Sequence, residues 1–135
     1  MHKVGLFPMV ADLLHPGHIS ALQEAKKYCD KLIVALNVNP TGDNSEKNKP
    51  VQTVFERYYQ LISCKYVDEV IPYDGEGDLL SLIQITDYDI RFIGEDHREY
   101  WTGMEYEKAH NIEVCIATRC NIHTTSLRKR IMEGK

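Results

Sequence analysis

The sequence predicts a three-layer α/β domain built on a doubly wound parallel sheet of about five strands. Strand-like apolar segments alternate with helical patterns along the whole chain of 135 residues, which is the order that βαβ units produce. The strand-like segments are continuously apolar, as in Leu32–Leu36, and this suits strands that are covered on both faces. The length fits one domain, so we expect a single domain over residues 1–135.

The strands are predicted from apolar runs that end in polar or turn-forming residues. Pro8 interrupts the first run, so we expect the regular strand to end near Phe7. Pro72 ends the third run for the same reason. The expected strands are 3–10, 32–36, 67–71, 89–93 and 112–117.

The helices are predicted from apolar residues that recur at three- and four-residue spacing. Ile19, Leu22 and Ala25 form such a face in the first helix, and Thr53 with Glu56 matches a capping box at the start of the second. The expected helices are 18–29, 53–64, 79–85, 102–110 and 124–132, and residues 37–49 form a polar loop.

The stretch Asp12–His18 lies where the first strand passes into the first helix. A helix N-terminus attracts anions, phosphate above all, because its first N–H groups have no partner in the helix and its dipole is positive there. Gly17 lets a ligand approach the backbone closely, and His15 and His18 flank the same point three residues apart. The sequence therefore predicts a phosphate site at this turn.

Other candidate site segments follow from the predicted order of elements. Ligands of open parallel sheets bind beyond the carboxyl ends of the strands, where the winding reverses. Besides residues 10–18, three segments fall at this edge: the loop with Lys47 and Lys49, residues 94–97, and residues 119–125.

Composition narrows the class of protein. Apolar residues make up 43% of the chain and charged residues 27%, which is ordinary for a globular domain. A net charge of −4 argues against nucleic acid as a partner, and no apolar run is long enough for membrane insertion. The four cysteines form no C-x-x-C pair, so we expect free thiols and a cytoplasmic location.

Several segments carry a family resemblance in the correct order along nearly the whole chain. They are His15-Pro16-Gly17-His18, Glu56-Arg57, Tyr66–Ile71, Gly94–His97 and Arg119–Thr125. Together they resemble the H-x-G-H nucleotidyltransferases in their cytidylyltransferase branch, and the glycerol-3-phosphate cytidylyltransferases in particular. The resemblance implies a Rossmann-like fold and transfer of CMP from CTP to a small phosphorylated alcohol, glycerol 3-phosphate first, with release of pyrophosphate. It also implies Mg²⁺ bound with CTP, and a homodimer.

The resemblance and the chemistry of the side chains suggest roles at the predicted sheet edge. Catalysis would fall to His15, His18, Lys49 and Arg119. The nucleotide would contact Met9, Val10, Asp12, Gly17, Gly94, Asp96, Thr124 and Thr125. Lys47 and Arg57 would bind the acceptor, and Asp12 would reach Mg²⁺ directly or through water. Arg57 has an equally open structural alternative, an ion pair with Glu56 or Asp68.

The chain departs from the family pattern at several places, among them His97, His123, Lys65 and Asn39. Met9-Val10 replaces the family's Gly-Thr before the signature, and the segment after Arg119 is one residue shorter. A different acceptor, or ATP in place of CTP, therefore remains an alternative. So do a nucleotide-binding protein without turnover and a zinc site formed by the two histidines with Asp12.

Overall fold

The computed structural model describes residues 2–41, 49–94, 99–117 and 124–134. Within these ranges five parallel strands form one sheet in the order β3-β2-β1-β4-β5. The strands are β1 (Val4–Met9), β2 (Lys31–Asn37), β3 (Glu69–Tyr73), β4 (Ile90–Gly94) and β5 (Glu113–Ala117). The chain winds outward from β1 to β3 and then returns to lay β4 on the other side of β1. The predicted doubly wound sheet is therefore confirmed, and its winding reverses between β1 and β4.

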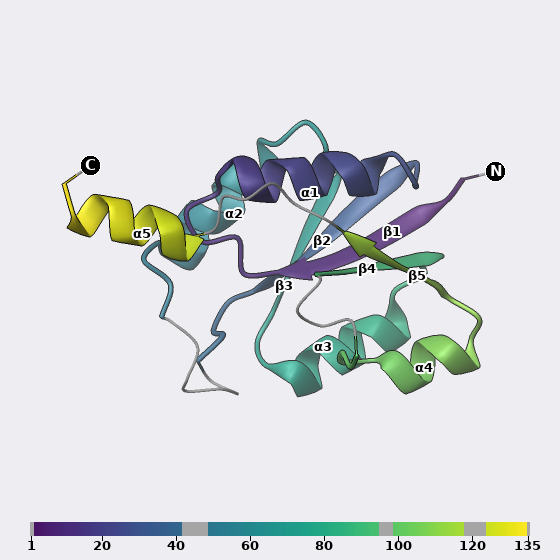
Figure 1. Ribbon diagram of the computed structural model, residues 1–135. Helices are drawn as coiled ribbons and strands as arrows, with labels where there is room; N and C mark the ends of the chain where they lie inside the picture. Colours follow the sequence, from purple (N-terminus) through teal and green to yellow (C-terminus); the bar gives the residue numbers. More distant parts are fainter. Residues whose placement is uncertain (1, 42–48, 95–98, 118–123, 135) are drawn as a thin grey trace.

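Helices cover both faces of the sheet (Figure 1). The helices α1 (Pro16–Lys26) and α2 (Val54–Ile62) lie on one face, and α3 (Glu76–Ile85) and α4 (Met104–Ala109) lie on the other. The last helix, α5 (Thr124–Met132), extends from the end of the sheet at which the strands finish. None of the helices in the described ranges is long and apolar enough to cross a membrane.

Two apolar cores follow from the alternation of side chains along each strand. Phe7 and Val34 point into the core beneath α1 and α2, whereas Leu6 and Ile33 point into the core beneath α3. Because β1 and β2 are buried on both faces, their sequences are apolar without a period of two. This packing fixes where the strands end and thus where the site segments leave the sheet.

Two strands continue past a proline at which the sequence predicts that they end. β1 continues through Pro8 to Met9, because β4 pairs only with Gly5 and Leu6, and Pro8 lies beyond that ladder. β3 continues through Pro72 to Tyr73, because β3 is an edge strand with a neighbour on one side only.

Helix starts also differ slightly from prediction. α1 begins at Pro16 rather than at residue 18, because proline is favoured in the first turn, where no N–H is needed. The predicted capping box of α2 is confirmed: Thr53 Oγ1 accepts from the Glu56 N–H, and Glu56 Oε1 accepts from the Thr53 N–H.

Candidate active site

The two histidines of the turn cap the N-terminus of α1. His15 is the N-cap residue, and its Nδ1 accepts a hydrogen bond from the Gly17 N–H at 3.0 Å. His18 Nδ1 accepts in return from the His15 N–H at 3.3 Å, which completes a reciprocal capping box. The sequence predicts unpaired N–H groups at this helix start, but the Gly17 N–H already donates a hydrogen bond to the His15 ring.

This capping fixes the protonation pattern of both rings. An imidazole nitrogen that accepts a hydrogen bond carries no proton, so each neutral ring holds its proton on Nε2. The ring centroids of His15 and His18 lie 4.0 Å apart with an angle of 35° between the planes. His15 is buried, and His18 is partly exposed. The turn thus holds two adjacent imidazole rings, each with its proton on Nε2, at the positive end of a helix.

The turn between β1 and α1 has a strained backbone. Ala11 and Leu13 have φ values of 56° and 53°, in the left-handed region that side-chain-bearing residues rarely adopt. The Leu13 N–H donates to Gln52 Oε1 at 2.7 Å, which helps to hold this conformation. Such strain persists only where surrounding contacts enforce it, and it clusters at functional sites.

Asp12 anchors the turn to the segment before α2 and to α5. Its Oδ1 accepts from the Gln52 N–H at 3.0 Å, and its Oδ2 accepts from the Val51 N–H at 2.9 Å. Arg128 of α5 donates to the same Oδ2 at 2.7 Å and to the Lys49 carbonyl oxygen at 2.9 Å. One buried carboxylate therefore joins three segments that the sequence separates.

Two opposing influences act on the pKa of Asp12. Burial favours the neutral acid, but the Gln52 and Val51 N–H groups and the Arg128 guanidinium outweigh it and lower the pKa below its ordinary value. The ionised form is therefore the one that the folded chain stabilises.

This lowered pKa predicts a loss of stability in acid. The contribution of Asp12 is fully present above its unfolded pKa, near 3.8, and is lost as the pH falls through the lower folded pKa. We expect Asp12→Asn to destabilise the chain most at pH 7, with a difference from wild type that shrinks toward pH 3. Urea unfolding across this pH range measures the difference, and a pH-independent difference would contradict the assignment.

Arg57 connects the ends of β1 and β2 from inside the protein. Its side chain is 1% exposed, and its guanidinium donates to the carbonyl oxygens of Val10, Asn37 and Val38 at 3.0, 2.7 and 3.0 Å. The guanidinium therefore holds the strand ends from which two site segments leave the sheet. Its predicted role as an acceptor-binding residue stays a prediction, since a bound acceptor would have to share this buried group.

Some of the remaining predicted site residues lie near the carboxyl ends of the strands or at the start of α5, and others lie outside the described residues. The carboxyl ends of β1 and β4 and the start of α1 hold Met9, Val10, Gly94 and Gly17. Lys49 lies just before Val51 and Gln52, whose N–H groups bind Asp12, and its own carbonyl oxygen accepts from Arg128. Thr124 and Thr125 begin α5. Lys47, Asp96 and Arg119 lie outside the described residues, so their predicted roles stay predictions.

Two residues of this network were missed from the sequence. Gln52 supports the strained turn through both its side chain and its N–H, and Arg128 carries the contact from α5. Neither lies in a motif with a recognisable spacing, and their partners are 39 to 116 positions away. The only signal in the sequence for Arg128 is that it is an arginine in the predicted last helix, which follows the candidate site segment 119–125.

The described residues offer little for direct metal binding. Within those ranges no group of three or more His, Cys, Asp or Glu side chains could hold a metal ion, so the zinc alternative gains no support. Both carboxylate oxygens of Asp12 already accept hydrogen bonds, which does not fit direct coordination. Binding of Mg²⁺ together with CTP stays a prediction.

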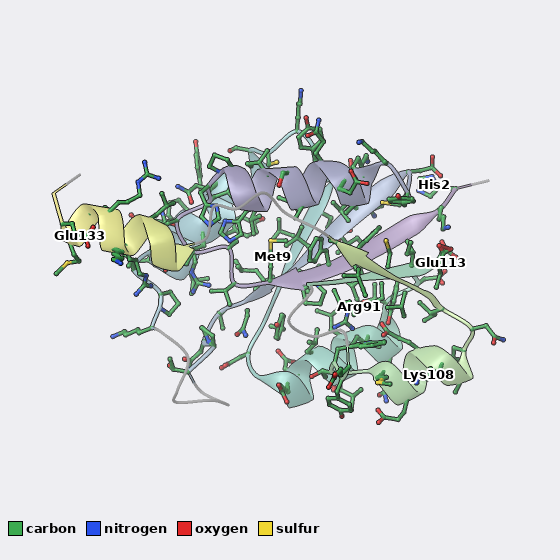
Figure 2. All side chains as sticks on the ribbon, viewed as in Figure 1. His2, Met9, Arg91, Lys108, Glu113 and Glu133 are labelled. Carbon is green, nitrogen blue, oxygen red and sulfur yellow. The ribbon has the colours of Figure 1, made fainter. Side chains whose placement is uncertain are left out.

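A second buried polar cluster lies on the opposite face of the sheet. Glu107 is fully buried and accepts from Tyr88 Oη at 2.6 Å, from Arg91 at 3.2 Å and from Trp101 Nε1 at 2.7 Å. Figure 2 shows Arg91 pointing from β4 toward the layer of α3 and α4. Burial and the neighbouring Glu107 carboxylate raise the pKa of Tyr88, so its hydroxyl stays protonated as a donor. This cluster holds Trp101, Thr102 and α4 against β4 and does not form part of the turn.

Comparison with known proteins places this arrangement in a family. The chain is 36% identical over 132 residues to the "Bifunctional protein HldE" of Caulobacter sp. (strain K31), covering 96% of this chain and 27% of that protein. It is 33% identical over 134 residues to the protein of the same name in Paramagnetospirillum magneticum, covering 98% of this chain and 27% of the relative. The chain thus spans only about a quarter of the length of these relatives.

Solved structures share the fold. The "lipopolysaccharide core biosynthesis protein" of Thermoplasma volcanium matches with a TM-score of 0.73 and 26% identity over 88% of this chain and 98% of that one. A pantoate-beta-alanine ligase from Francisella tularensis matches with a TM-score of 0.61 and 22% identity, covering 94% of this chain and 68% of that one, and shows the fold alone. The family model "Cytidylyltransferase-like" matches residues 6–131. The chain therefore belongs to the cytidylyltransferase-like family, within the nucleotidyltransferase superfamily that the sequence resemblance indicated.

Proposed function

We propose that the chain transfers a nucleoside monophosphate from a nucleoside triphosphate to the phosphate of a small alcohol, with release of pyrophosphate. The observation that carries the proposal is the pair of Nε2–H donors that the capping box of His15 and His18 fixes at the start of α1. They lie beside β1, where the winding of the sheet reverses and ligands of such folds bind.

The reaction needs no nucleophile from the protein. A phosphate oxygen of the acceptor forms a bond to the α-phosphorus, the bond from that phosphorus to the bridging oxygen breaks, and pyrophosphate leaves with the electron pair. Negative charge spreads over the non-bridging and leaving oxygens, so catalysis consists of placing donors there before the reaction begins. The Nε2–H groups of His15 and His18 would be such donors.

Positively charged side chains would offset the negative charge of the triphosphate and of the acceptor phosphate. Lys47 and Lys49 would act as point charges near the triphosphate and the acceptor phosphate, and the planar guanidinium of Arg119 would bind two phosphate oxygens at once. The N-terminus of α5, at Thr124 and Thr125, supplies a further positive helix end for an anion.

CTP is the first candidate nucleotide, and glycerol 3-phosphate is the leading acceptor. The family model and the resemblance of the motifs support this choice. A sugar phosphate is the second candidate acceptor, because the relative from Thermoplasma volcanium is described as acting in lipopolysaccharide core biosynthesis. ATP is the alternative nucleotide. A homodimer and a cytoplasmic location are part of the same proposal.

A panel of substrates tests the proposal. We expect pyrophosphate release when CTP is combined with glycerol 3-phosphate or with one of a set of sugar phosphates, and no release from CTP alone. A thermal-shift series with CTP and ATP checks the base: equal stabilisation by both nucleotides would contradict the choice of cytidine. Silence across the whole panel, with nucleotide still bound, would favour the binding protein without turnover.

A further inference from the structure

The last helix, α5, is held to the domain mainly by polar contacts. It extends beyond the end of the sheet at which the strands finish (Figure 1). Among its described residues none belongs to either apolar core, and Ile131 and Met132 are 68% and 86% exposed. A helix that buries little apolar surface gains little from packing, so its position depends on the polar side chains that reach the domain.

Arg128 makes such contacts with two segments of the domain. Its Nη2 donates to Asp12 Oδ2 at 2.7 Å and to the Lys49 carbonyl oxygen at 2.9 Å. The side chains of Arg128 and Asp12 are 28% and 7% exposed, so water and salt screen this ion pair less than a fully exposed pair. Because one nitrogen makes both contacts, a displacement of α5 would disturb both segments at once.

The segments that Arg128 joins carry residues of the candidate active site. Asp12 lies in the strained turn that leads to His15. Lys49 would lie near the triphosphate, and residues 51 and 52, which follow it, bind Asp12 through their N–H groups. Arg128 itself comes three residues after Thr125, at whose helix end an anion would bind. One guanidinium therefore connects three segments that the proposed function places around the phosphates.

We propose that Arg128 is a positioning residue for nucleotide binding, which holds the start of α5 and the segment at Lys49 against the histidine turn so that their positive charges face the same triphosphate. This inference rests on the proposed function, and it adds a residue that the motifs of the sequence do not include. In this role Arg128 acts through Asp12 and Lys49 and not by contact with the phosphates.

The position of these charges governs binding of the nucleotide more than the chemical step. The oxygens of a triphosphate are charged before the reaction begins, so Lys49 and the start of α5 act on the bound state and on the transition state alike. Loss of such uniform binding raises KM and leaves kcat nearly unchanged. The Nε2–H groups of His15 and His18 act on charge that develops during the reaction, so their loss lowers kcat instead.

Calorimetric titration with the α,β-methylene analogues of CTP and ATP measures binding without turnover. We expect Arg128→Met to weaken binding at least about 10-fold, because small displacements of positioned groups cost factors of this size or more. Arg128→Lys keeps one nitrogen that can donate to both Asp12 and Lys49, and it should bind within about 3-fold of wild type.

Arg130→Met is the matched control for this titration. It removes the same charge from an exposed position of the same helix, so it should bind the analogues as wild type does. Wild-type affinity in Arg128→Met, or equal losses in the two methionine variants, would overturn the proposal.

Steady-state kinetics separates this role from a merely structural one. Arg128→Met should raise KM for the nucleotide by a factor similar to the loss of affinity, and it should change kcat by less than about 3-fold. A substitution that only unfolded part of the protein would lower kcat at constant KM, and that result would overturn the proposal.

Amide hydrogen exchange of the nucleotide-free chain is independent of the proposed function. The Val51 and Gln52 N–H groups donate to Asp12, so Arg128→Met should raise their exchange rates at least about 10-fold, and that of the buried Val34 amide in β2 by a smaller factor. A wild-type chain that binds neither analogue would refute the proposed function and, with it, the role of Arg128 in nucleotide binding. Unchanged exchange at Val51 and Gln52 in Arg128→Met would refute the role of Arg128 alone.

Discussion

Replacing His18 with alanine is expected to lower turnover at least about 100-fold, with the fold retained. A well-placed donor to the charge that develops in a transition state contributes roughly 10²–10³ in rate. His18 is partly exposed and lies in the first turn of a helix, so its removal leaves no large cavity. Steady-state kinetics with the productive substrate pair measures the effect, and circular dichroism checks the fold. A fully active His18→Ala enzyme would refute the role of this residue.

His15 allows the capping role to be separated from the chemical one. Asparagine is a strong N-cap residue, so His15→Asn should keep an acceptor for the Gly17 N–H while it removes the Nε2–H donor. His15→Ala removes both and should cost roughly 0.5–2 kcal/mol of unfolding free energy as well. We expect the two variants to lose turnover equally, by about 100-fold or more, while only the alanine variant loses stability. Turnover restored by asparagine would show that His15 acts as a cap alone.

Replacing Arg57 with methionine is expected to have the largest effect on stability. The substitution leaves the carbonyl oxygens of Val10, Asn37 and Val38 without their donor in the protein interior. Each unsatisfied buried group costs about 1–3 kcal/mol, so the loss should reach about 3 kcal/mol or more. Urea unfolding measures it.

The control for this experiment is the same substitution at an exposed arginine. Arg130 lies on the exposed side of α5, and Arg130→Met should change the unfolding free energy by less than about 0.5 kcal/mol. Equal effects of the two substitutions would show that the three carbonyl contacts of Arg57 do not stabilise the ends of β1 and β2.

The order of strands and helices could be predicted from the sequence because each strand or helix is indicated by a pattern of neighbouring residues. The apolar runs of β1 and β2, the Thr53–Glu56 capping box and the turn at His15 and His18 all lie within a few consecutive residues. The prolines gave wrong predictions only for the ends of β1 and β3. A proline ends a strand only if its missing N–H would have bonded to a neighbouring strand, and the sequence of one strand does not show which strands pair with it.

The support of the site could not be predicted in the same way. The resemblance suggests that Asp12 reaches Mg²⁺, but it does not indicate that the carboxylate joins Gln52 and Arg128. The resemblance also suggests that Arg57 binds the acceptor, but it does not indicate that the guanidinium donates hydrogen bonds to backbone carbonyl oxygens. Such contacts link residues 19 to 116 positions apart and leave no periodic signal along the chain.

Nitrogen-15 NMR of the imidazole rings at pH 8, during titration with a non-hydrolysable nucleoside triphosphate, tests the central claim most directly. Before nucleotide is added, His15 and His18 should both show the tautomer with the proton on Nε2, as their Nδ1 contacts require. On saturation, the Nε2–H signals of these two rings should move together, while His2 and His110, which lie away from the turn, stay unchanged. Protonation at Nδ1, or a titration that moves neither ring, would contradict a phosphate-binding turn.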